Sequence, residues 1–261
     1  MTPRDWRAAS VFRPESLIRE ARRQKGLPDE AVPDVCVLDP DGDLVRYLMR
    51  HGGEVMRAWP CYHSELVVWH GIGFVGCAVG APFAVLIAEQ AFACGCELMV
   101  SVTSAGQLVA REDPPYFVVI DRALRDEGTS GHYLPPGEYA EVPADVLKRL
   151  WPALTAAGRV LRGGSWTTDA PFRETEMAVA DATARGLLAV EMEAAGLYAF
   201  AQARQRPVLC LAHVTNRLGR EGDFEKGEAD GALASLRLIE AAAAAWRNSP
   251  EFCDAHKSIA G

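Results

Sequence analysis

The residues of this chain whose types and spacing first suggest chemistry are two glutamates on either side of a methionine, Glu191-Met192-Glu193. An apolar segment precedes them and an Ala-rich segment with good helix propensity follows, so we expect them at a strand-to-helix junction. Side chains two residues apart point the same way from an extended segment. Both carboxylates can therefore accept hydrogen bonds from vicinal hydroxyls, such as those of a ribose, with Met192 against the sugar. Alternatively, one glutamate caps the helix, where the helix dipole favours a carboxylate, and the other is solvated.

A second candidate site follows the apolar run 35–38, where acidic residues and a glycine lead into a segment, 44–50, that has a helical pattern. A strand, a glycine-containing turn and a helix start can bind phosphate through backbone N–H groups. Gly42 and Arg46 are the candidate phosphate ligands of this loop. The alternative is an ordinary turn with a surface arginine.

A third stretch, 166–175, concentrates aromatic rings, hydroxyls and an arginine, a combination that suits a nucleobase. An aromatic ring can stack on a base, and a guanidinium can donate to its carbonyl oxygens. Another apolar strand, 207–214, leads to a polar Asn-Arg pair. The candidate base-binding residues are Trp166, Thr168, Phe172, Arg173 and Asn216.

His132 lies in a long polar loop, 125–136. Its ring can act as a general base or as a substrate contact, or it can simply order the turn.

Together these stretches resemble the nucleoside phosphorylase superfamily, which includes uridine phosphorylase, purine nucleoside phosphorylase and the adenosylhomocysteine-type nucleosidases. Glu191-Met192-Glu193-Ala194-Ala195 looks like the ribose-binding signature of that family, and Gly42-Asp43-Leu44-Val45-Arg46 is similar to its Gly-Asp-x-x-Arg phosphate loop. The likeness runs from about Ser10 to Trp246. Asn216 with the following Arg217 is most similar to uridine-phosphorylase-like members, since purine-cleaving relatives carry an Asp at the first of these positions.

The resemblance also implies roles. Glu191, Met192 and Glu193 would hold the ribose, with Glu193 gripping the hydroxyls of an oxocarbenium-like sugar. Arg173 and Arg217 would stabilise charge on the departing base. Because Asn cannot donate a proton to a leaving purine as Asp does, a pyrimidine or a 6-oxo base is indicated.

The chain departs from the family pattern at the phosphate site. Ser104 matches a phosphate-binding Thr, but Ser101 stands where the family has an Arg, so a dianion loses a bidentate partner. Arg13 stands where the N-terminal arm of the family brings a His to the ribose site of the neighbouring subunit, and it could supply the missing charge there. Arg57 and His63 are further candidates for a residue given to the neighbour.

Strands alternating with helices over 261 residues, 49% of them apolar, predict an α/β fold. We expect a single domain, 34–248, with a central mixed, twisted and partly closed β-sheet surrounded by helices. An N-terminal arm and helix, 1–33, with the helix itself at 14–25, would precede it, and a tail, 249–261, would follow. Within the domain, the apolar run 98–102 predicts a buried strand.

The composition excludes several classes of function. A net charge of −8 does not indicate a nucleic-acid surface. No apolar run reaches the roughly 18 residues of a membrane span, and the polar start lacks a signal peptide, so we expect a cytoplasmic protein. Seven scattered cysteines without a CxxC pair are typical of reduced thiols. Neither a metal nor an organic cofactor is implied.

The expected function is phosphorolysis of a nucleoside, giving free base and a (deoxy)ribose 1-phosphate, with inorganic phosphate as co-substrate. Two alternatives remain open: hydrolysis of the same bond by water, and a non-catalytic nucleoside-binding protein on the same fold. The family implies a homodimer, or a hexamer built as a trimer of dimers, with each site completed by the neighbouring subunit.

Overall fold

The computed structural model describes residues 5–218 and 222–248, in which ten strands form one sheet and five of these strands close on themselves. The closed part is possible because β10 pairs with both β6 and β5. The closed strands, in spatial order, are β10 (Val208–Arg217), β6 (Tyr116–Asp126), β8 (Val160–Thr168), β9 (Ala189–Glu191) and β5 (Leu98–Gln107). The others are β1 (Val35–Asp39), β4 (Ile72–Gly76), β3 (Val67–Trp69) and β2 (Glu54–Val55), which extend the sheet beyond β5, and β7 (Tyr139–Glu141), which pairs with β6.

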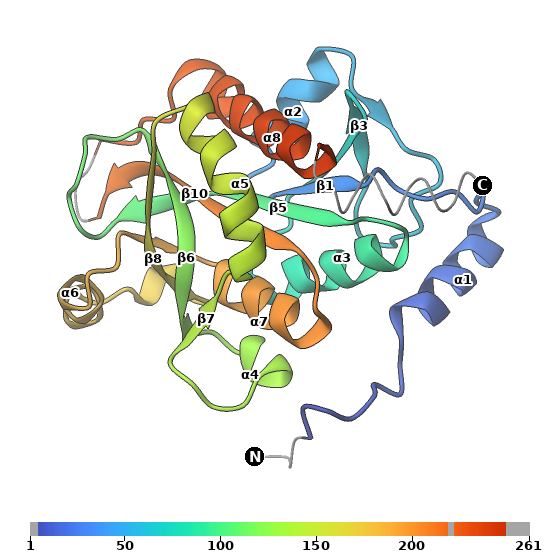
Figure 1. Cartoon of the computed structure of the whole chain (residues 1–261), viewed down its shortest axis with the longest axis horizontal. Helices are drawn as coiled ribbons and strands as arrows, with labels where there is room; N and C mark the ends of the chain where they lie inside the picture. The colour runs from blue at the N-terminus through green and yellow to red at the C-terminus, as the bar shows by residue number, and fades with distance from the viewer. Residues whose placement is uncertain (1–4, 219–221, 249–261) are drawn as a thin grey trace.

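Helices surround the sheet (Figure 1). The pair α3 (Ala81–Ala93) and α7 (Ala194–Arg204) packs together, and so does the pair α5 (Ala144–Ala157) and α8 (Ala232–Arg247). The remaining helices are α1 (Pro14–Lys25), α2 (Asp43–Arg50), α4 (Ser130–Tyr133) and α6 (Glu176–Ala184), with 3₁₀ turns η1 (Pro171–Arg173) and η2 (Glu228–Gly231).

The sheet mixes parallel and antiparallel pairs. β1 is parallel to β4 and β5, and β10 is parallel to β5 but antiparallel to β6. Every residue of β1 is buried, as expected for a strand covered on both faces. The predicted α/β fold with a mixed, partly closed sheet inside a layer of helices is therefore confirmed.

Two predicted boundaries are wrong in a way that matters for the site. The strand expected at 98–102 continues to Gln107, because β10 and β9 both pair with its second half. The last strand likewise continues beyond 214 to Arg217. Ser104 and Asn216 therefore lie on strands and not in loops. The tail expected at 249–261 lies outside the described residues, and the boundary at residue 33 stays a prediction.

Candidate functional site

Glu191 ends β9, and its carboxylate is buried among donors from the protein itself. One oxygen accepts hydrogen bonds from the hydroxyls of Ser165, at 3.0 Å, and Thr167. The other accepts from the backbone N–H groups of Glu193 and Ala194, each at 2.7 Å. Glu191 thus ties β8 to the start of α7. A ribose could use this carboxylate only if one of these bonds opened.

Glu193 precedes α7 and has a different environment. Its Oε1 accepts from the backbone N–H of Gly80 at 2.7 Å, while the buried Oε2 has no hydrogen-bond partner among the described residues. Gly80 precedes α3, so the starts of α3 and α7 meet at this carboxylate. Gly196 allows that approach, since a Cβ there would lie 2.7 Å from the Cβ of Ala81. A buried acceptor without a donor is ready for a ligand hydroxyl.

Burial raises the pKa of Glu193 to about 8, and the neighbouring Glu191 carboxylate adds to the rise. The Gly80 N–H and the Thr103 hydroxyl oppose it. Burial also raises the pKa of Glu191, against the hydrogen bonds that it accepts. A positive charge developing on a sugar beside Glu193 would favour its ionised form. Met192, half-buried, lies between the two glutamates in the chain.

The predicted phosphate loop is occupied by carboxylates of the chain. Asp39, at the end of β1, accepts from the backbone N–H of Gly42 at 3.1 Å and of Val45 at 2.9 Å. Asp41 accepts from the backbone N–H of Ser104 at 2.7 Å, which joins the loop to β5. This contact brings the loop that carries Gly42 to Ser104, while the role of either residue in phosphate binding stays a prediction. The N–H groups of Gly42, Val45 and Ser104, however, are already satisfied by these carboxylates.

The positively charged side chains at this loop already have partners within the protein. Arg46 donates to the Asp41 carbonyl at 3.0 Å and pairs with Asp43, which pairs in turn with Lys226. Gly42 has φ +75°, and a Cβ there would lie 2.8 Å from Arg46 Nη1, so the loop needs glycine at this position. Burial raises the pKa of Asp39 to about 7, with the Asp41 and Asp43 carboxylates adding to the rise.

Ser101 lies inside β5, between the strands β1 and β10, where it is paired with Leu38 of β1 and with Cys210 of β10. Its hydroxyl is buried and has no hydrogen-bond partner among the described residues. A serine at this place carries no charge, so it does not replace the guanidinium that the family pattern led us to expect.

A small polar cavity of about 20 Å³ lies behind the loop. Asp39, Asp41, Thr103, Ser104 and His213 are among the residues that line it. This volume is about that of one water molecule, and the lining offers several polar partners for it.

His213 is held in place in β10 by its ring contacts. The ring stacks on Phe117 with centroids 4.4 Å apart, and a Cβ at Gly231 would come within 2.3 Å of it. Burial lowers the pKa of His213 to about 4, and the nearby Lys226 lowers it further, so the imidazole is neutral near pH 7.

Sequence reasoning missed Asp39, Asp41, Thr103 and His213 as site residues. The Asp-Pro-Asp-Gly-Asp run was a visible signal, but it resembled an ordinary acidic turn. The histidine stood within an apolar strand.

The predicted base-binding residues divide into two groups. Trp166 is buried, packs in an apolar cluster with Leu187 and Val190, and donates from Nε1 to Asp126 at 2.9 Å. The Thr168 hydroxyl, also buried, accepts from the backbone N–H of residue 170 at 3.2 Å. By contrast, Phe172 is fully exposed and Arg173 is exposed beside it in η1. The structure does not gather these four side chains around one cavity.

Asn216 and Arg217 end β10, half-buried. Asn216 pairs with Gly106 of β5, which pairs on its other side with Val190, one residue before Glu191. The polar end of β10 thus lies one strand away from the glutamates. The Arg217 guanidinium forms an ion pair with Asp113, and its backbone N–H donates to Asp223 at 3.1 Å.

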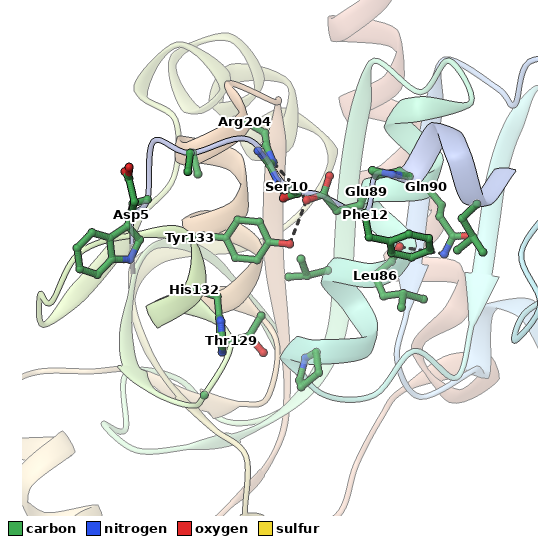
Figure 2. Close-up of a pocket in the computed structure, with 18 residues that line it drawn as sticks. Asp5, Ser10, Phe12, Leu86, Glu89, Gln90, Thr129, His132, Tyr133 and Arg204 are labelled. Carbon is green, nitrogen blue, oxygen red and sulfur yellow. Dashed lines mark hydrogen bonds and ion pairs between the residues drawn. The ribbon is translucent and has the colours of Figure 1, made fainter. Parts of the chain in front are cut away.

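His132 lies in α4, where it lines a cavity of about 730 Å³ between the N-terminal arm and α3 (Figure 2). In the same view the Tyr133 hydroxyl donates to Glu89 at 3.0 Å, and Arg204 reaches Glu89 at 3.3 Å. Arg13 lines a separate cavity of about 270 Å³.

Like Arg13, the other two candidates for a contribution to a neighbouring subunit, Arg57 and His63, are exposed. Their roles stay predictions.

Within residues 5–218 and 222–248, no three or more side chains of His, Cys, Asp or Glu are grouped so as to hold a metal ion. No helix in this described part of the chain combines the length and apolar character that a membrane crossing requires.

Comparisons with known proteins agree with the fold. A sequence model of the Phosphorylase superfamily matches residues 29–246. Guanosine phosphorylase from Halorubrum lacusprofundi is 32% identical over 226 residues, 80% of this chain and 91% of that protein. The crystal structure of uridine phosphorylase from Vibrio fischeri matches with a TM-score of 0.69 at 20% identity, over 82% of this chain and 92% of that one. The structure of AMP nucleosidase from Bacteroides thetaiotaomicron matches with a TM-score of 0.68 at 18% identity, over 84% and 92%.

Proposed function

Because the chain belongs to the phosphorylase superfamily, we propose that it cleaves the N-glycosidic bond of a nucleoside whose ribose is held by Glu193. The observation that carries this proposal is the buried Oε2 of Glu193, which no donor of the described chain satisfies. The vicinal hydroxyls of a ribose supply that donor. Met192 lies against the sugar.

Glu193 contributes most when the sugar becomes oxocarbenium-like, because a carboxylate stabilises the developing positive charge. An interaction accelerates the reaction only if it is stronger in the transition state than in the ground state. Removing one well-placed polar group from such a site typically costs on the order of 10² to 10³ in rate.

The proposed base is a 6-oxopurine such as that of guanosine. The relative from Halorubrum lacusprofundi is a guanosine phosphorylase. In addition, Asn216 at the end of β10 can hydrogen-bond a base without giving it a proton. Phe172 and Arg173 are proposed to contact the base. Trp166 and Thr168 fix the segment that carries them, and Arg217 stabilises charge on the departing base.

Inorganic phosphate is the proposed co-substrate, bound at Gly42, Arg46 and Ser104. The similarity to a guanosine phosphorylase supports this choice. To bind there, phosphate must take the Ser104 N–H from the Asp41 carboxylate. No other cofactor is proposed. A homo-oligomer in the cytoplasm, with Arg13 completing the ribose site of a neighbour, is part of the proposal.

Hydrolysis is a second candidate, and two specific observations favour it. Asp39 and Asp41 already satisfy the N–H groups of Gly42 and Ser104. In addition, an uncharged Ser101 replaces an expected arginine. A water molecule that attacks the sugar is uncharged, so it needs neither these backbone N–H groups nor an arginine.

The test is base release from guanosine, inosine, adenosine, uridine and thymidine, each with and without inorganic phosphate. Release that needs phosphate and yields a sugar 1-phosphate supports phosphorolysis. Equal release without phosphate, yielding free sugar, supports hydrolysis. Absence of release from any nucleoside that binds would contradict both and favour a binding protein.

A further inference from the structure

The loop between β1 and α2 reaches β5 through one polar contact, between the Asp41 carboxylate and the backbone N–H of Ser104. A carboxylate and a phosphate oxygen are both anionic acceptors, so they compete for this donor. Asp41 is half-buried, so solvent screens its charge only in part.

The nearby cations do not neutralise Asp41. Arg46 and Lys226 both form ion pairs with Asp43, and the hydrogen bond that Arg46 donates to Asp41 goes to its backbone carbonyl. Asp39 adds a second carboxyl group behind the loop. An incoming dianion therefore meets the negative charge of Asp41 at the same donor that it needs.

Asp41 also lies within electrostatic reach of the ribose end of the site. Its carboxylate contributes to the raised pKa of Glu193 and acts on His213 as well. Thr103, whose hydroxyl interacts with Glu193, lines the same cavity as Asp41, so this cavity connects the loop to the ribose end of the site.

The cavity beside Asp41 is large enough for a water molecule but too small for a phosphate ion. The cavity of about 20 Å³ accommodates one water molecule, with Thr103, Ser104 and His213 as further polar neighbours. It has no room for a phosphate while the Asp41 side chain stays in place.

From these contacts we infer that Asp41 is the residue that determines acceptor specificity, by excluding phosphate from the Ser104 amide and leaving a site of the size of water. The inference rests on the hydrolytic candidate of the proposed function, in which water and not phosphate attacks the sugar. Asp41 sets the partition between sugar phosphate and free sugar among the products.

Two variants separate charge from volume. Asp41→Asn keeps the shape and an acceptor oxygen but removes the charge, and Asp41→Ala removes both the charge and the side chain. Asp181→Asn, on exposed α6, is the control for the loss of one surface carboxylate. Thermal melting of each variant establishes that the fold is intact.

Phosphate binding is measured directly by calorimetry with inorganic phosphate, and products are measured with guanosine across a phosphate series. We expect Asp41→Ala to bind phosphate at least about tenfold more tightly than the unmodified chain, with Asp41→Asn between them and Asp181→Asn unchanged. The ratio of sugar phosphate to free sugar should rise in the same order. Unchanged or weaker phosphate binding in folded Asp41→Ala would overturn the inference.

The calorimetric result does not depend on turnover. If neither the unmodified chain nor its variants release base, the proposed function fails. The measured phosphate affinity of the variants then still shows whether Asp41 excludes phosphate from the Ser104 amide.

Discussion

Glu191 and Glu193 stand two residues apart, yet their carboxylates have opposite relations to the protein. Both oxygens of Glu191 accept hydrogen bonds from β8 and from the start of α7. Glu193 accepts a hydrogen bond from Gly80 and has the Thr103 hydroxyl as a polar neighbour, and its second oxygen is buried and without a hydrogen-bond partner among the described residues. One carboxylate therefore holds the junction together, and the other is left for a ligand.

Because of this division, substitution of Glu191 should mainly reduce stability, whereas substitution of Glu193 should mainly reduce turnover. Glu191→Ala leaves buried hydroxyl and N–H donors unsatisfied, so we expect it to lower the free energy of unfolding by roughly 3 kcal/mol. At pH 5, where the folded Glu193 carboxyl is protonated, Glu193→Gln should change that free energy by about 1 kcal/mol or less, but it should reduce turnover on the order of 10²- to 10³-fold. Urea denaturation and base release measure the two effects. A strongly destabilised Glu193→Gln that keeps its turnover would refute the division.

The raised pKa of Glu193 makes its contribution to stability depend on pH. The folded carboxyl titrates at about 8 and the unfolded one near 4.5, so between these values the folded state holds more protons. Stability therefore falls as the pH rises through this window. Glu193→Gln lacks this group, so its melting temperature should rise relative to that of the unmodified chain as the pH increases from 5 to 8. The corresponding difference in the free energy of unfolding should reach on the order of a few kcal/mol.

A gap between the two melting temperatures that is the same at pH 5 and pH 8 would show that Glu193 does not titrate in this window.

The close packing of α3 and α7 gives a third prediction. Gly196→Ala places a methyl group 2.7 Å from the Cβ of Ala81, and overpacking of this kind costs about 1–3 kcal/mol. Because the start of α3 carries Gly80, turnover should fall as well. The double variant Gly196→Ala/Ala81→Gly restores the space and should recover both stability and turnover. Failure of the double variant to recover either would contradict this packing.

Arg173 provides a surface test of base binding. It is exposed and no helix cap or core contact depends on its side chain in the described structure, so Arg173→Ala should stay within about 0.5 kcal/mol of the original stability. If the η1 segment contacts the base as proposed, the KM for the nucleoside should rise about tenfold. Arg159→Ala, at another exposed arginine, is the control. An unchanged KM in Arg173→Ala would remove this side chain from the base site.

Local signals in the sequence were sufficient for much of the fold. Pro14 in the first turn and Gly26 at the C-cap mark α1, which has the predicted bounds. The transition from apolar residues to an Ala-rich run likewise located β9 and α7. The extension of β5 to Gln107 was not predicted, because it depends on pairing with β9 and β10 from distant parts of the chain.

The division of labour between the two glutamates could not be predicted for the same reason. Glu191 receives its hydroxyl donors from residues 26 and 24 positions away, and Glu193 its N–H donor from 113 positions away. The contact between Asp41 and Ser104 joins residues 63 positions apart. Spacing identified the carboxylates as candidates, but only tertiary packing decides which of them is saturated.

The role of Glu193 as the ribose acceptor is tested most directly by comparing guanosine with 2′,3′-dideoxyguanosine on the unmodified chain and on Glu193→Ala, with kcat/KM for base release as the readout. We expect the unmodified chain to favour guanosine on the order of 10²- to 10³-fold. In Glu193→Ala that preference should nearly vanish, because the group that accepts the hydroxyls is gone. A preference that persists undiminished in folded Glu193→Ala would show that the ribose hydroxyls are bound elsewhere.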